Sequence, residues 1–323
     1  MTSHDAITVP PVAPPRADRA IGADEVERLR SLLMPEPGVD LSPVAWAPAP
    51  LPLGEGWDNT IWDVGSMPDG TPLALRVARR EVAVELLDHE VLVLRHLAAS
   101  AQTLPMRLQS VLATADAAVM VTWAFGHSAA DGTDDERSGC VEVLARMLAR
   151  MHAPAPAGLA RNPVRGCPLA DRDAALRADL FVAEIDDEAA ERALAVWDQG
   201  LAAPVWDDPE LLLHGDPHPA NVIVADDAGA PWLIDFGDTT PGDPASDLGA
   251  LALFRPDALD PSGAVLAAYR ADAAWDGAAD DGTWDALIAR ARAWSVRMAV
   301  SLLTAYGRGE GLGRCAAEVL RRL

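Results

Sequence analysis

The amino-acid sequence predicts an α+β fold in two lobes, a small antiparallel β-sheet with one main helix followed by a larger, mostly helical part. Short apolar runs separated by Gly- and Pro-containing turns occupy residues 49–126, and a single long helical pattern interrupts them. Beyond Gly126, helical periodicity dominates to the C-terminus, with one further hairpin inside it. We therefore place the N-terminal lobe at residues 21–125 and the helical lobe at residues 126–323.

The N-terminal lobe starts with a helical pattern at residues 23–34, which is expected to end at Pro35. Three short strands are expected next, then a helix, then a hairpin of two extended segments. In chain order these are residues 49–54, 59–65 and 72–80, the helix at 81–100, and the segments 109–116 and 117–126. This order describes a small antiparallel sheet that carries one helix.

The helical lobe begins with a polar loop at residues 127–139, which leads into a helix at 140–153. Further helical patterns cover about 170–200 and the region from Asp247 to the C-terminus. In residues 283–307 apolar side chains recur at helical spacing, at Trp284, Leu287, Ile288, Ala291 and Met298. Such a stripe is typical of a helix packed on a core.

The chain is strongly acidic, with a formal net charge of -23 from 49 acidic and 26 basic side chains. This balance argues against a nucleic-acid partner, because a phosphate backbone requires clustered Lys and Arg. It would attract a cationic small molecule, although acidic surfaces also keep proteins soluble. The chain contains no lysine, so a cation that binds a phosphate must be arginine, histidine or a metal ion.

Nothing in the sequence predicts export or membrane insertion. The Pro-rich residues 1–20 lack the basic start and continuous apolar segment of a secretory signal, and we expect them to be disordered. No stretch approaches the ~20 apolar residues of a membrane span. Cys140, Cys167 and Cys315 lie far apart without metal-ligand spacing, which favours reduced thiols in a cytoplasmic protein. We expect a monomer or a dimer.

Two acids and an amide stand beside short apolar runs in the stretch LLLHGDPHPANVIVADDAGAPWLIDFGD. Pro217 and Pro219 exclude a regular helix between Asp216 and Asn221, so the segment is expected to be a rigid loop. The apolar runs on either side of DDAGA predict a hairpin that returns Asp235 to the side of Asn221. Oxygen ligands in that arrangement suit Mg²⁺, which keeps waters and shares substrate phosphates.

These positions match the pattern H-x-D-x-x-x-x-N followed by D-F-G, with His214, Asp216, Asn221 and Asp235 in the key places. The pattern resembles the catalytic loop and metal motif of the protein-kinase-like superfamily. The flanking sequences HGDPHPANVIV and LIDFGDTTPGDPASDLGAL are similar to the aminoglycoside phosphotransferase family, which includes macrolide and related antibiotic phosphotransferases. Pro217 replaces the usual Leu. The resemblance implies a two-lobed protein-kinase-like fold, Asp216 as catalytic base, and Asn221 and Asp235 as Mg²⁺ ligands.

The resemblance also implies nucleotide-binding residues in the N-terminal lobe. The turn LGEGWDNTIW stands where a kinase-like lobe covers the nucleotide phosphates, and it offers Asn59 and Thr60 as polar contacts. The lysine that is usual on this strand is absent, and Arg76 is the candidate to take its place. Arginine keeps the positive charge and adds a planar fork, so it can bind phosphate. Its expected partner is Glu90, with Glu85 on the same helix as the alternative.

Two further expectations concern the ends of this lobe. Arg79 and Arg80 are interpreted as a solvated strand end. In VTWAFG, the backbone of Trp123 and Ala124 is implied to face the nucleotide base at the hinge between the lobes, with ordinary packing as the other role of the Trp123 ring.

Several polar residues near the motifs are interpreted structurally. His214 is expected to brace the loop, and Asp247 to fix it through backbone amides, as in similar proteins. Asp238 and Asp243 are interpreted as turn residues. The acidic runs at 183–192 and 276–282 are interpreted as solvated helix ends, with a grip on an amine-bearing substrate as the alternative.

The resemblance implies an enzyme that transfers the γ-phosphate of ATP or GTP, with Mg²⁺, to a hydroxyl of a small molecule. The leading candidate acceptor is an antibiotic of the aminoglycoside, macrolide, peptide or nucleoside type, and the acidic balance weakly favours a cationic one. The alternatives are a kinase for a metabolite such as a sugar or amino-alcohol, and a nucleotide-binding pseudokinase. The presence of Asp216, Asn221 and Asp235 together argues against the pseudokinase.

Overall fold

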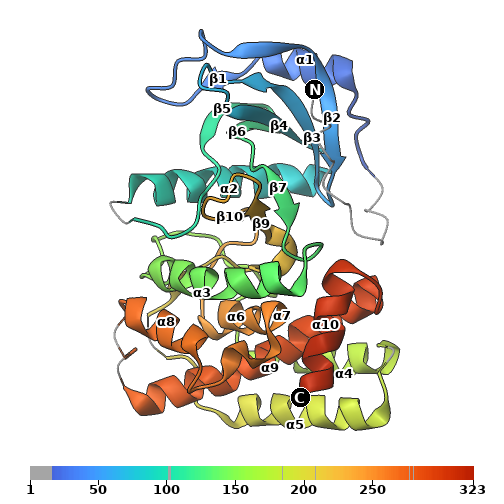
Figure 1. The fold of residues 1–323 in the computed structure, drawn as a ribbon, viewed down its shortest axis with the longest axis vertical. Coiled ribbons are helices and arrows are strands. Elements are labelled where there is room, and N and C mark those ends of the chain that lie inside the picture. The colour runs from blue at the N-terminus through green and yellow to red at the C-terminus, as the bar shows by residue number, and fades with distance from the viewer. Residues whose placement is uncertain (1–16, 101–102, 184, 208, 276, 279) are drawn as a thin grey trace. The chain divides into compact units, whose positions relative to one another are not determined.

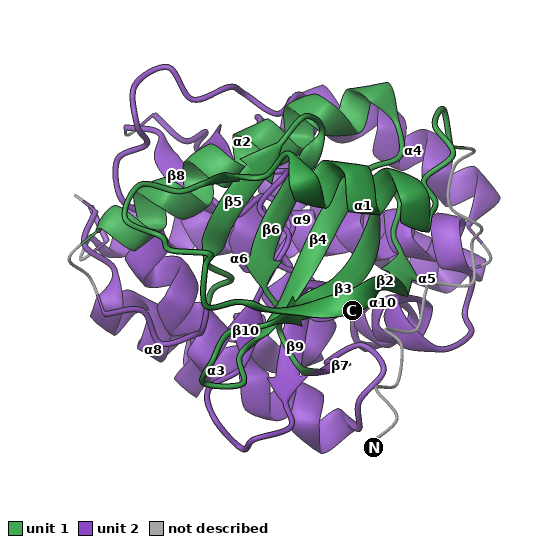
Figure 2. Ribbon diagram, turned by 90° about the horizontal axis from the view of Figure 1, so that it is seen from above, with its two compact units in different colours: residues 1–101, 108–125 green, residues 102–107, 126–323 purple. Residues whose placement is uncertain are grey.

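The computed structural model describes residues 17–100, 103–183, 185–207, 209–275, 277–278 and 280–323. Most of the expected disordered tail, residues 1–16, lies outside the described residues. The chain divides into two compact units, one of residues 1–101 and 108–125 and the other of residues 102–107 and 126–323 (Figure 2). Arg107 belongs with the second unit because its backbone N–H donates to Pro231 O at 2.9 Å, and its carbonyl accepts from Leu233 N at 3.0 Å.

The first unit is a six-stranded antiparallel sheet with two helices (Figure 1). Its elements are α1 (Ala23–Ser31), β1 (Met34–Pro35), β2 (Ala45–Glu55), β3 (Asn59–Ser66), β4 (Pro72–Ala78), α2 (Glu81–Ala99), β5 (Val111–Ala115) and β6 (Ala118–Thr122). The strand order is β1-β5-β6-β4-β3-β2. The predicted three strands, helix and hairpin are thus confirmed.

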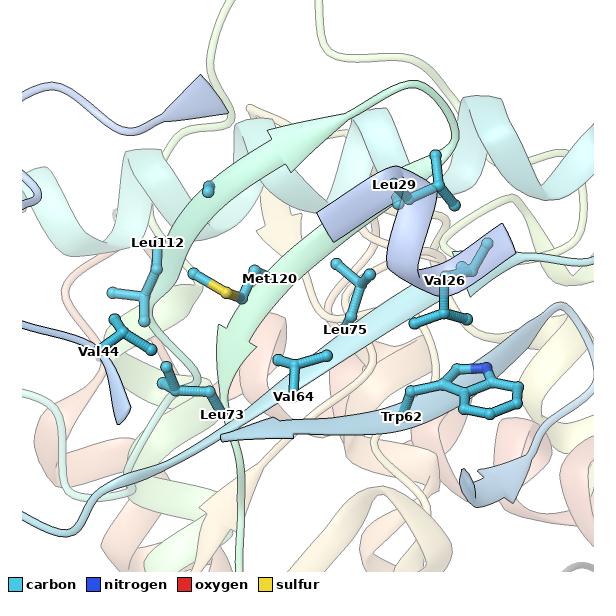
Figure 3. Packing of buried hydrophobic residues seen from close by; sticks show 12 residues of the cluster. Val26, Leu29, Val44, Trp62, Val64, Leu73, Leu75, Leu112 and Met120 are labelled. Carbon is cyan, nitrogen blue, oxygen red and sulfur yellow. The ribbon is translucent and has the colours of Figure 1, made fainter. Parts of the chain in front are cut away.

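Alternation along the strands separates two apolar faces of this sheet. One face packs with α1 through a cluster that includes Val26, Leu29, Trp62, Leu75 and Met120 (Figure 3). The other face packs with α2 through a second cluster, made of Ala78, Ala83, Leu87, Val91, Ala117, Val119 and Val121. Residues of β4 therefore point alternately toward α1 and toward α2.

The predicted end of the first helix was wrong. Helix α1 ends at Ser31, four residues before Pro35. Met34 and Pro35 instead pair with Thr114 and Ala113 of β5, so they form an edge strand of the sheet. A proline is compatible with an edge strand because the missing N–H is not required on the open side.

The second unit is mostly helical, as predicted (Figure 1). Its longer helices are α3 (Asp134–Met151), α4 (Asp173–Val182), α5 (Asp187–Ala202), α8 (Ala264–Asp272), α9 (Asp281–Tyr306) and α10 (Gly311–Arg322). Its short elements are β7 (Gly126–Ser128), η1 (Leu169–Arg172), β8 (Leu211–Leu213), η2 (Pro219–Asn221), β9 (Val222–Ala225), β10 (Trp232–Leu233), β11 (Thr240–Gly242), α6 (Ala245–Gly249), α7 (Leu251–Phe254) and η3 (Pro256–Leu259).

Helix α9 lies at the centre of this unit and contacts α4, α5, α6 and α10. The predicted apolar stripe of α9 is buried at every position, from Trp284 to Met298. Two sets of short strands stand beside the helices. Strands β10, β9 and β7 form one small sheet, and β11 pairs with β8.

The predicted start of α3 was wrong, because the helix begins at Asp134 and not at Cys140. Thr133 and Glu136 form a capping box, in which the Thr133 side chain accepts from the Glu136 N–H and the Glu136 carboxylate accepts from the Thr133 N–H. The capping box satisfies two backbone N–H groups at the helix start, so the polar residues from Asp134 onward are helical. Among the residues that the structure describes, no helix is long and apolar enough to cross a membrane.

Candidate active site

The hairpin of β9 and β10 brings Asn221 next to the residue that precedes Asp235. Trp232 pairs with Ile223 and Leu233 with Val222, as the turn DDAGA predicts. One step further, the Ile234 N–H donates to the Asn221 carbonyl at 3.0 Å. The backbones that carry the amide and the second acid are therefore neighbours, although fourteen positions separate the two residues in the sequence.

The loop between β8 and η2 is held by a buried carboxylate, as predicted for Asp247. Its Oδ2 accepts from His214 N at 2.7 Å, and its Oδ1 accepts from Gly215 N at 2.9 Å. His152 Nε2 lies 3.1 Å from Oδ2, and its Nδ1 lies 2.6 Å from the Tyr269 hydroxyl. Asp247, His152 and Tyr269 are fully buried, so this support is shielded from solvent. Charge-assisted bonds of this kind are stronger than neutral ones.

His214 braces the loop, and its surroundings fix its tautomer. Its Nδ1 accepts from the Asp216 N–H at 3.2 Å, so Nε2 carries the proton and donates to the Ile234 carbonyl at 3.1 Å. Burial lowers the pKa of His214 below its ordinary value, against the opposing charges of Asp247 and Asp216. The imidazole is therefore neutral and ties the loop to the hairpin strand that precedes Asp235.

Gly215 is required by the geometry of the same loop. Its φ is +91°, in the left-handed region, and a Cβ there would lie 2.1 Å from the Asp238 carbonyl oxygen. Only glycine allows both the conformation and this close approach. The close approach brings the turn that contains Asp238 alongside the start of the loop that carries Asp216.

Asp216 is held by an arginine that the sequence reading did not single out. Arg165 Nη2 lies 2.8 Å from Oδ1 of Asp216, and Arg165 Nε lies 3.7 Å from Oδ2 of Asp238. His218 Nε2 lies 3.5 Å from the other carboxylate oxygen of Asp216. Burial alone would raise the pKa of Asp216, but the charge of the adjacent Arg165 lowers it overall. Asp216 is thus kept as a carboxylate.

Asp238 is a turn residue, as predicted, and also a second acid beside Asp216. The Asn162 amide donates to its Oδ1 at 2.9 Å. Its pKa is raised by burial and by the charge of Asp216, although Arg165 acts in the opposite direction. Asp216, Asp238 and Arg165 therefore form one coupled group of charges.

Asn221 and Asp235 have the donor groups that a magnesium ion requires. The Asn221 amide nitrogen donates to the Asp216 backbone carbonyl at 2.9 Å, which leaves its side-chain oxygen as the free end of the amide. Asp235 has φ +67°, a conformation that non-glycine residues adopt rarely and mostly at functional sites. Among the described residues no cluster of three His, Cys, Asp or Glu side chains could hold a metal. The pair fits Mg²⁺ that is shared with phosphates better than a metal held by protein alone.

In the first unit, Arg76 of β4 and Glu90 of α2 form the expected ion pair, with Nη1 2.6 Å from Oε1. Both side chains are buried. A buried pair of this kind holds the strand arginine in a fixed place, because separating the charges would leave one of them unpaired. The role of the pair toward a nucleotide stays a prediction.

The turn between β2 and β3 places Asn59 and Thr60 differently. Asn59 pairs with Ala78 and Ile61 with Arg76, so the Asn59 side chain lies on the Arg76 face of the sheet. Thr60 pairs with Val77, on the opposite face, and its hydroxyl accepts from Trp62 Nε1 at 3.0 Å. The geometry therefore favours Asn59 over the Thr60 side chain for a contact near Arg76.

The interpretation of Arg79 and Arg80 as a solvated strand end was wrong for Arg79, because the turn folds back onto it, whereas Arg80 is half-exposed. Arg79 is buried, pairs with Glu55 at 2.7 Å, and donates from Nη1 to the Gly56 carbonyl at 3.1 Å. Arg80 pairs with Asp58 at 2.8 Å. The two arginines thus fix the turn that the sequence assigns to phosphates.

Trp123 and Ala124 follow the end of β6. The Trp123 N–H donates to the Pro72 carbonyl at 2.8 Å, which extends the pairing of β6 with β4 by one step. The expected contact with a nucleotide base therefore rests on the Trp123 carbonyl and the Ala124 N–H, and it stays a prediction.

The described parts of the acidic runs are helix ends, as interpreted, while Glu184, Asp276 and Ala279 lie outside the described residues. Asp186 caps α5 by accepting from Ala189 N at 2.8 Å, and Asp280 caps α9 by accepting from Thr283 N at 2.8 Å. Exposed pairs with arginine follow, from Glu188 to Arg192 within α5 at 2.8 Å and from Asp281 of α9 to Arg270 of α8 at 2.7 Å. Acidic side chains at a helix N-terminus interact favourably with the helix dipole and stabilise the helix, so these runs need no substrate to explain them.

The sequence reading missed Arg165, Asn162 and the ion pair of Asp243 with Arg290, whose Nε lies 2.7 Å from Asp243 Oδ2. The only sequence signal for Arg165 is its place in the Pro- and Gly-containing loop NPVRGCP, which lies between two helices. Loops of this kind often carry functional side chains. The partner of Arg165 could not be read from the sequence, since Asp216 lies far along the chain.

Comparisons with known proteins add to these observations. The sequence profile described as the phosphotransferase enzyme family matches residues 51–281. No protein of curated function matches the sequence.

Solved structures with a similar fold include three antibiotic phosphotransferases. A macrolide 2′-phosphotransferase type I has a TM-score of 0.56 and 19% identity, over 93% of this chain and 98% of that one. The streptomycin–ATP–APH(2″)-IIa ternary complex has a TM-score of 0.52 and 15% identity, over 94% and 97%. The GDP and kanamycin complex of APH(2″)-IIIa has a TM-score of 0.54 and 19% identity, over 85% and 92%. At these identities the likeness concerns the fold.

Proposed function

Since this chain belongs to the phosphotransferase enzyme family, we propose that it transfers the γ-phosphate of a nucleoside triphosphate to a hydroxyl group of a small molecule. The observation that supports this most directly is the arrangement around Asp216. Its carboxylate is held as an anion by Arg165, while its backbone carbonyl is bonded to Asn221, the predicted metal ligand. The same loop thus carries the proposed base for the acceptor hydroxyl and a proposed ligand of the Mg²⁺ that accompanies the donor nucleotide.

Asp216 acts first as a hydrogen-bond acceptor. It orients the acceptor hydroxyl toward the γ-phosphate and takes its proton as the new bond forms. A carboxylate with a lowered pKa is a weak base, which suits phosphoryl transfer, because the proton leaves late and positioning dominates the rate. General-base assistance adds roughly 10²–10⁴ in rate.

Asn221 and Asp235 would hold Mg²⁺ beside the phosphates of the donor. The ion neutralises charge on the phosphate oxygens when it is bound. Arg76, fixed by Glu90, contacts the donor phosphates, and the backbone of Trp123 and Ala124 contacts the base. ATP and GTP are both proposed as donors, since similar structures hold ATP and GDP. A cytoplasmic location follows from these donors.

Antibiotic inactivation is the proposed role, since the similar solved structures are macrolide and aminoglycoside phosphotransferases. A metabolite kinase is the second candidate. Arg165 favours it, because this arginine offsets part of the negative charge of Asp216 and Asp238 and leaves them less able to attract a polycation. A pseudokinase is disfavoured by the joint presence of Asp216, Asn221 and Asp235.

The proposed function is tested with Asp216→Asn and a panel of antibiotics and metabolite alcohols. Phosphorylated product, detected as a mass gain of one phosphate, identifies the acceptor. Asp216→Asn is expected to lower turnover by about 10²–10⁴ and to leave Mg–nucleotide affinity nearly unchanged. Unchanged turnover of this variant would remove Asp216 from the chemistry. A panel without any product, combined with no nucleotide binding, would defeat the proposal.

A further inference from the structure

A network of hydrogen bonds runs from the segment after α8 to the loop that carries Asp216. The Trp275 indole Nε1 lies 3.3 Å from the Tyr269 hydroxyl, and this hydroxyl lies 2.6 Å from Nδ1 of His152. On the other side of the imidazole ring, His152 Nε2 lies 3.1 Å from Oδ2 of Asp247. The Asp247 carboxylate accepts from the two backbone N–H groups that begin the loop. These side chains thus connect α8 with the backbone next to Asp216.

The direction of the hydrogen bonds in this network follows from Trp275. An indole N–H can only donate, so the Tyr269 oxygen accepts from it. In the described part of the protein, the only other hydrogen-bond neighbour of the Tyr269 hydroxyl is His152, so the hydroxyl donates its proton to Nδ1. A neutral imidazole that accepts at Nδ1 carries its proton on Nε2. His152 therefore donates from Nε2 to the Asp247 carboxylate.

The opposite tautomer of His152 would weaken the support of the loop. Its unprotonated Nε2 would face a carboxylate oxygen at 3.1 Å, and two acceptors at that distance repel each other. His152, Tyr269 and Asp247 are fully buried and Trp275 is nearly so, which means that solvent does not screen this contact. The Tyr269 hydroxyl thus selects the tautomer in which Asp247 has a third donor besides the two backbone N–H groups.

The packing of the Tyr269 ring does not require its hydroxyl. The ring stacks on Trp284 of α9, with the centroids 6.0 Å apart and an interplanar angle of 29°, and it meets the His152 ring edge-on at 5.5 Å. A phenylalanine would keep both contacts. A buried hydroxyl costs free energy unless it is hydrogen-bonded, so its presence here points to the hydrogen bonds that it makes.

We propose that Tyr269 and Trp275 are positioning residues for phosphoryl transfer. They act by fixing the His152 tautomer that holds Asp247, and through Asp247 they fix the loop of Asp216. The effect on turnover rests on the proposed function, whereas the effect on the loop does not. Turnover depends on the loop because a catalytic group displaced by about 1 Å can lose about 10² in rate.

The first test observes the loop directly, by hydrogen exchange of the backbone amides of His214 and Gly215 in the full chain. Tyr269→Phe removes only the hydroxyl. Exchange at these two amides, relative to the most protected amides of α9, is expected to be at least about fivefold faster than in the native protein, because the support of Asp247 is weakened. Unchanged relative exchange would overturn the proposal.

Trp197→Phe is the matched control for this variant. Trp197 is fully buried in α5, and its Nε1 donates to Asp173 Oδ1 at 2.8 Å, so the control also loses one hydrogen bond of a buried side chain, but one outside the network. It should lower the stability of the protein without a selective change at His214 and Gly215. If both variants accelerate exchange at these amides equally, general destabilisation is the cause and the proposal fails.

Trp275→Phe tests the far end of the network. It keeps an aromatic ring next to Trp206 and leaves the Tyr269 hydroxyl free to rotate. Exchange at the two loop amides should rise, but by less than in Tyr269→Phe. This milder variant also tests the proposal if Tyr269→Phe does not fold. No rise would overturn the assignment of Trp275 as a positioning residue.

A double-mutant cycle tests whether Tyr269 acts through the tautomer of His152. In His152→Gln the side-chain amide can donate toward Asp247 and has no tautomer to select. Tyr269→Phe should therefore accelerate exchange of the loop amides much less in the His152→Gln background than in the native background. Equal acceleration in the two backgrounds would overturn the proposed route.

Steady-state hydrolysis of the nucleotide, with water as acceptor, tests the consequence for turnover. In Tyr269→Phe, kcat is expected to fall roughly 10- to 100-fold, with the KM for the nucleotide nearly unchanged. An unchanged kcat together with faster loop exchange, or a change in KM alone, would mean that the network serves stability only and would overturn the positioning role. If the native protein neither binds nor hydrolyses nucleotide, the proposed function fails, and the exchange experiments still test the link to the loop.

Discussion

Arg165 and Asp216 form a direct ion pair, with Nη2 2.8 Å from Oδ1. His218 Nε2 lies 3.5 Å from the other oxygen of Asp216, Oδ2. The pair therefore fixes the orientation of the carboxylate, and in the proposed mechanism Oδ2 accepts the hydrogen bond from the acceptor hydroxyl. Arg165 is in this sense a positioning residue, since it acts through Asp216.

Replacing Arg165 by Gln is expected to lower turnover and to leave the KM for the nucleotide nearly unchanged. A carboxylate released from its fixed orientation loses alignment, and a displacement of about 1 Å can lower the rate by about 10²-fold. Arg165→Lys keeps the charge without the planar fork and should restore part of the loss. Steady-state kinetics with water as acceptor provide the measurement before the true acceptor is known. If turnover falls equally in the Gln and Lys variants, the charge of Arg165 is not what orients Asp216 for turnover.

The sequence predicted the parts of the site that depend on local pattern. The turn DDAGA between two apolar runs predicted the hairpin of β9 and β10, and this hairpin brings Asn221 beside Ile234. Asp247 and His214 hold the loop as the motif implied. Arg76 pairs with Glu90, as the resemblance to the family implied.

The other features of the site depend on tertiary contacts, which cannot be predicted from the periodicity of the sequence. The pairing of Arg165 with Asp216 joins a loop and a strand end that are about fifty positions apart, and no local rule selects it. The burial of Arg79 follows from the fold-back of a turn, whereas a charged strand end is usually exposed. The early start of α3 is different, because the capping box of Thr133 and Glu136 is readable in TDDE.

Nucleotide binding is expected to depend on magnesium through Asn221 and Asp235. In Asn221→Ala the ligand oxygen and the bond to the Asp216 carbonyl are both lost. In Asp235→Asn the charge is lost and the size is kept. Both variants should require higher Mg²⁺ concentrations for nucleotide binding, with the larger increase in Asp235→Asn, because Mg²⁺ prefers carboxylate ligands.

Calorimetric titration of a non-hydrolysable nucleotide at several Mg²⁺ concentrations measures this effect. Without Mg²⁺, in excess chelator, the native protein and both variants should bind the nucleotide equally weakly. A variant with the native Mg²⁺ dependence would show that its residue is not a ligand.

Gly215→Ala is expected to impair both stability and turnover. The added Cβ would lie 2.1 Å from the Asp238 carbonyl oxygen, at a backbone φ of +91°. A residue held in such a conformation costs on the order of 1–3 kcal/mol, and relief of the clash would displace the loop that carries Asp216.

Gly139→Ala is the matched control for this substitution. Gly139 lies inside α3, where an added Cβ meets no atom within 4 Å. An alanine in a helix interior is favourable by about 0.5–1 kcal/mol relative to glycine, so this variant should be slightly more stable with normal turnover. Chemical denaturation and kinetics of both proteins provide the comparison. Similar changes in the two variants would contradict the special role of Gly215.

The stability of the fold is expected to decrease as the pH falls from about 7 to about 5, in part through His214. Burial lowers the pKa of this imidazole in the folded protein, while in the unfolded chain it takes a proton near pH ~6.5. Below that value the unfolded state binds a proton that the folded state does not, so unfolding becomes easier. A single group of this kind contributes at most about 1.4 kcal/mol per pH unit.

His214→Gln is the variant that tests this dependence. A glutamine amide can donate toward the Ile234 carbonyl in place of Nε2, but it does not titrate. The variant should be less stable at pH 7, because the bond from Asp216 N to Nδ1 is lost, and its stability should change less between pH 7 and pH 5. Denaturation midpoints of both proteins at several pH values provide the measurement. If stability changes equally with pH in the variant and the native protein, a neutral His214 is not the cause of the pH dependence.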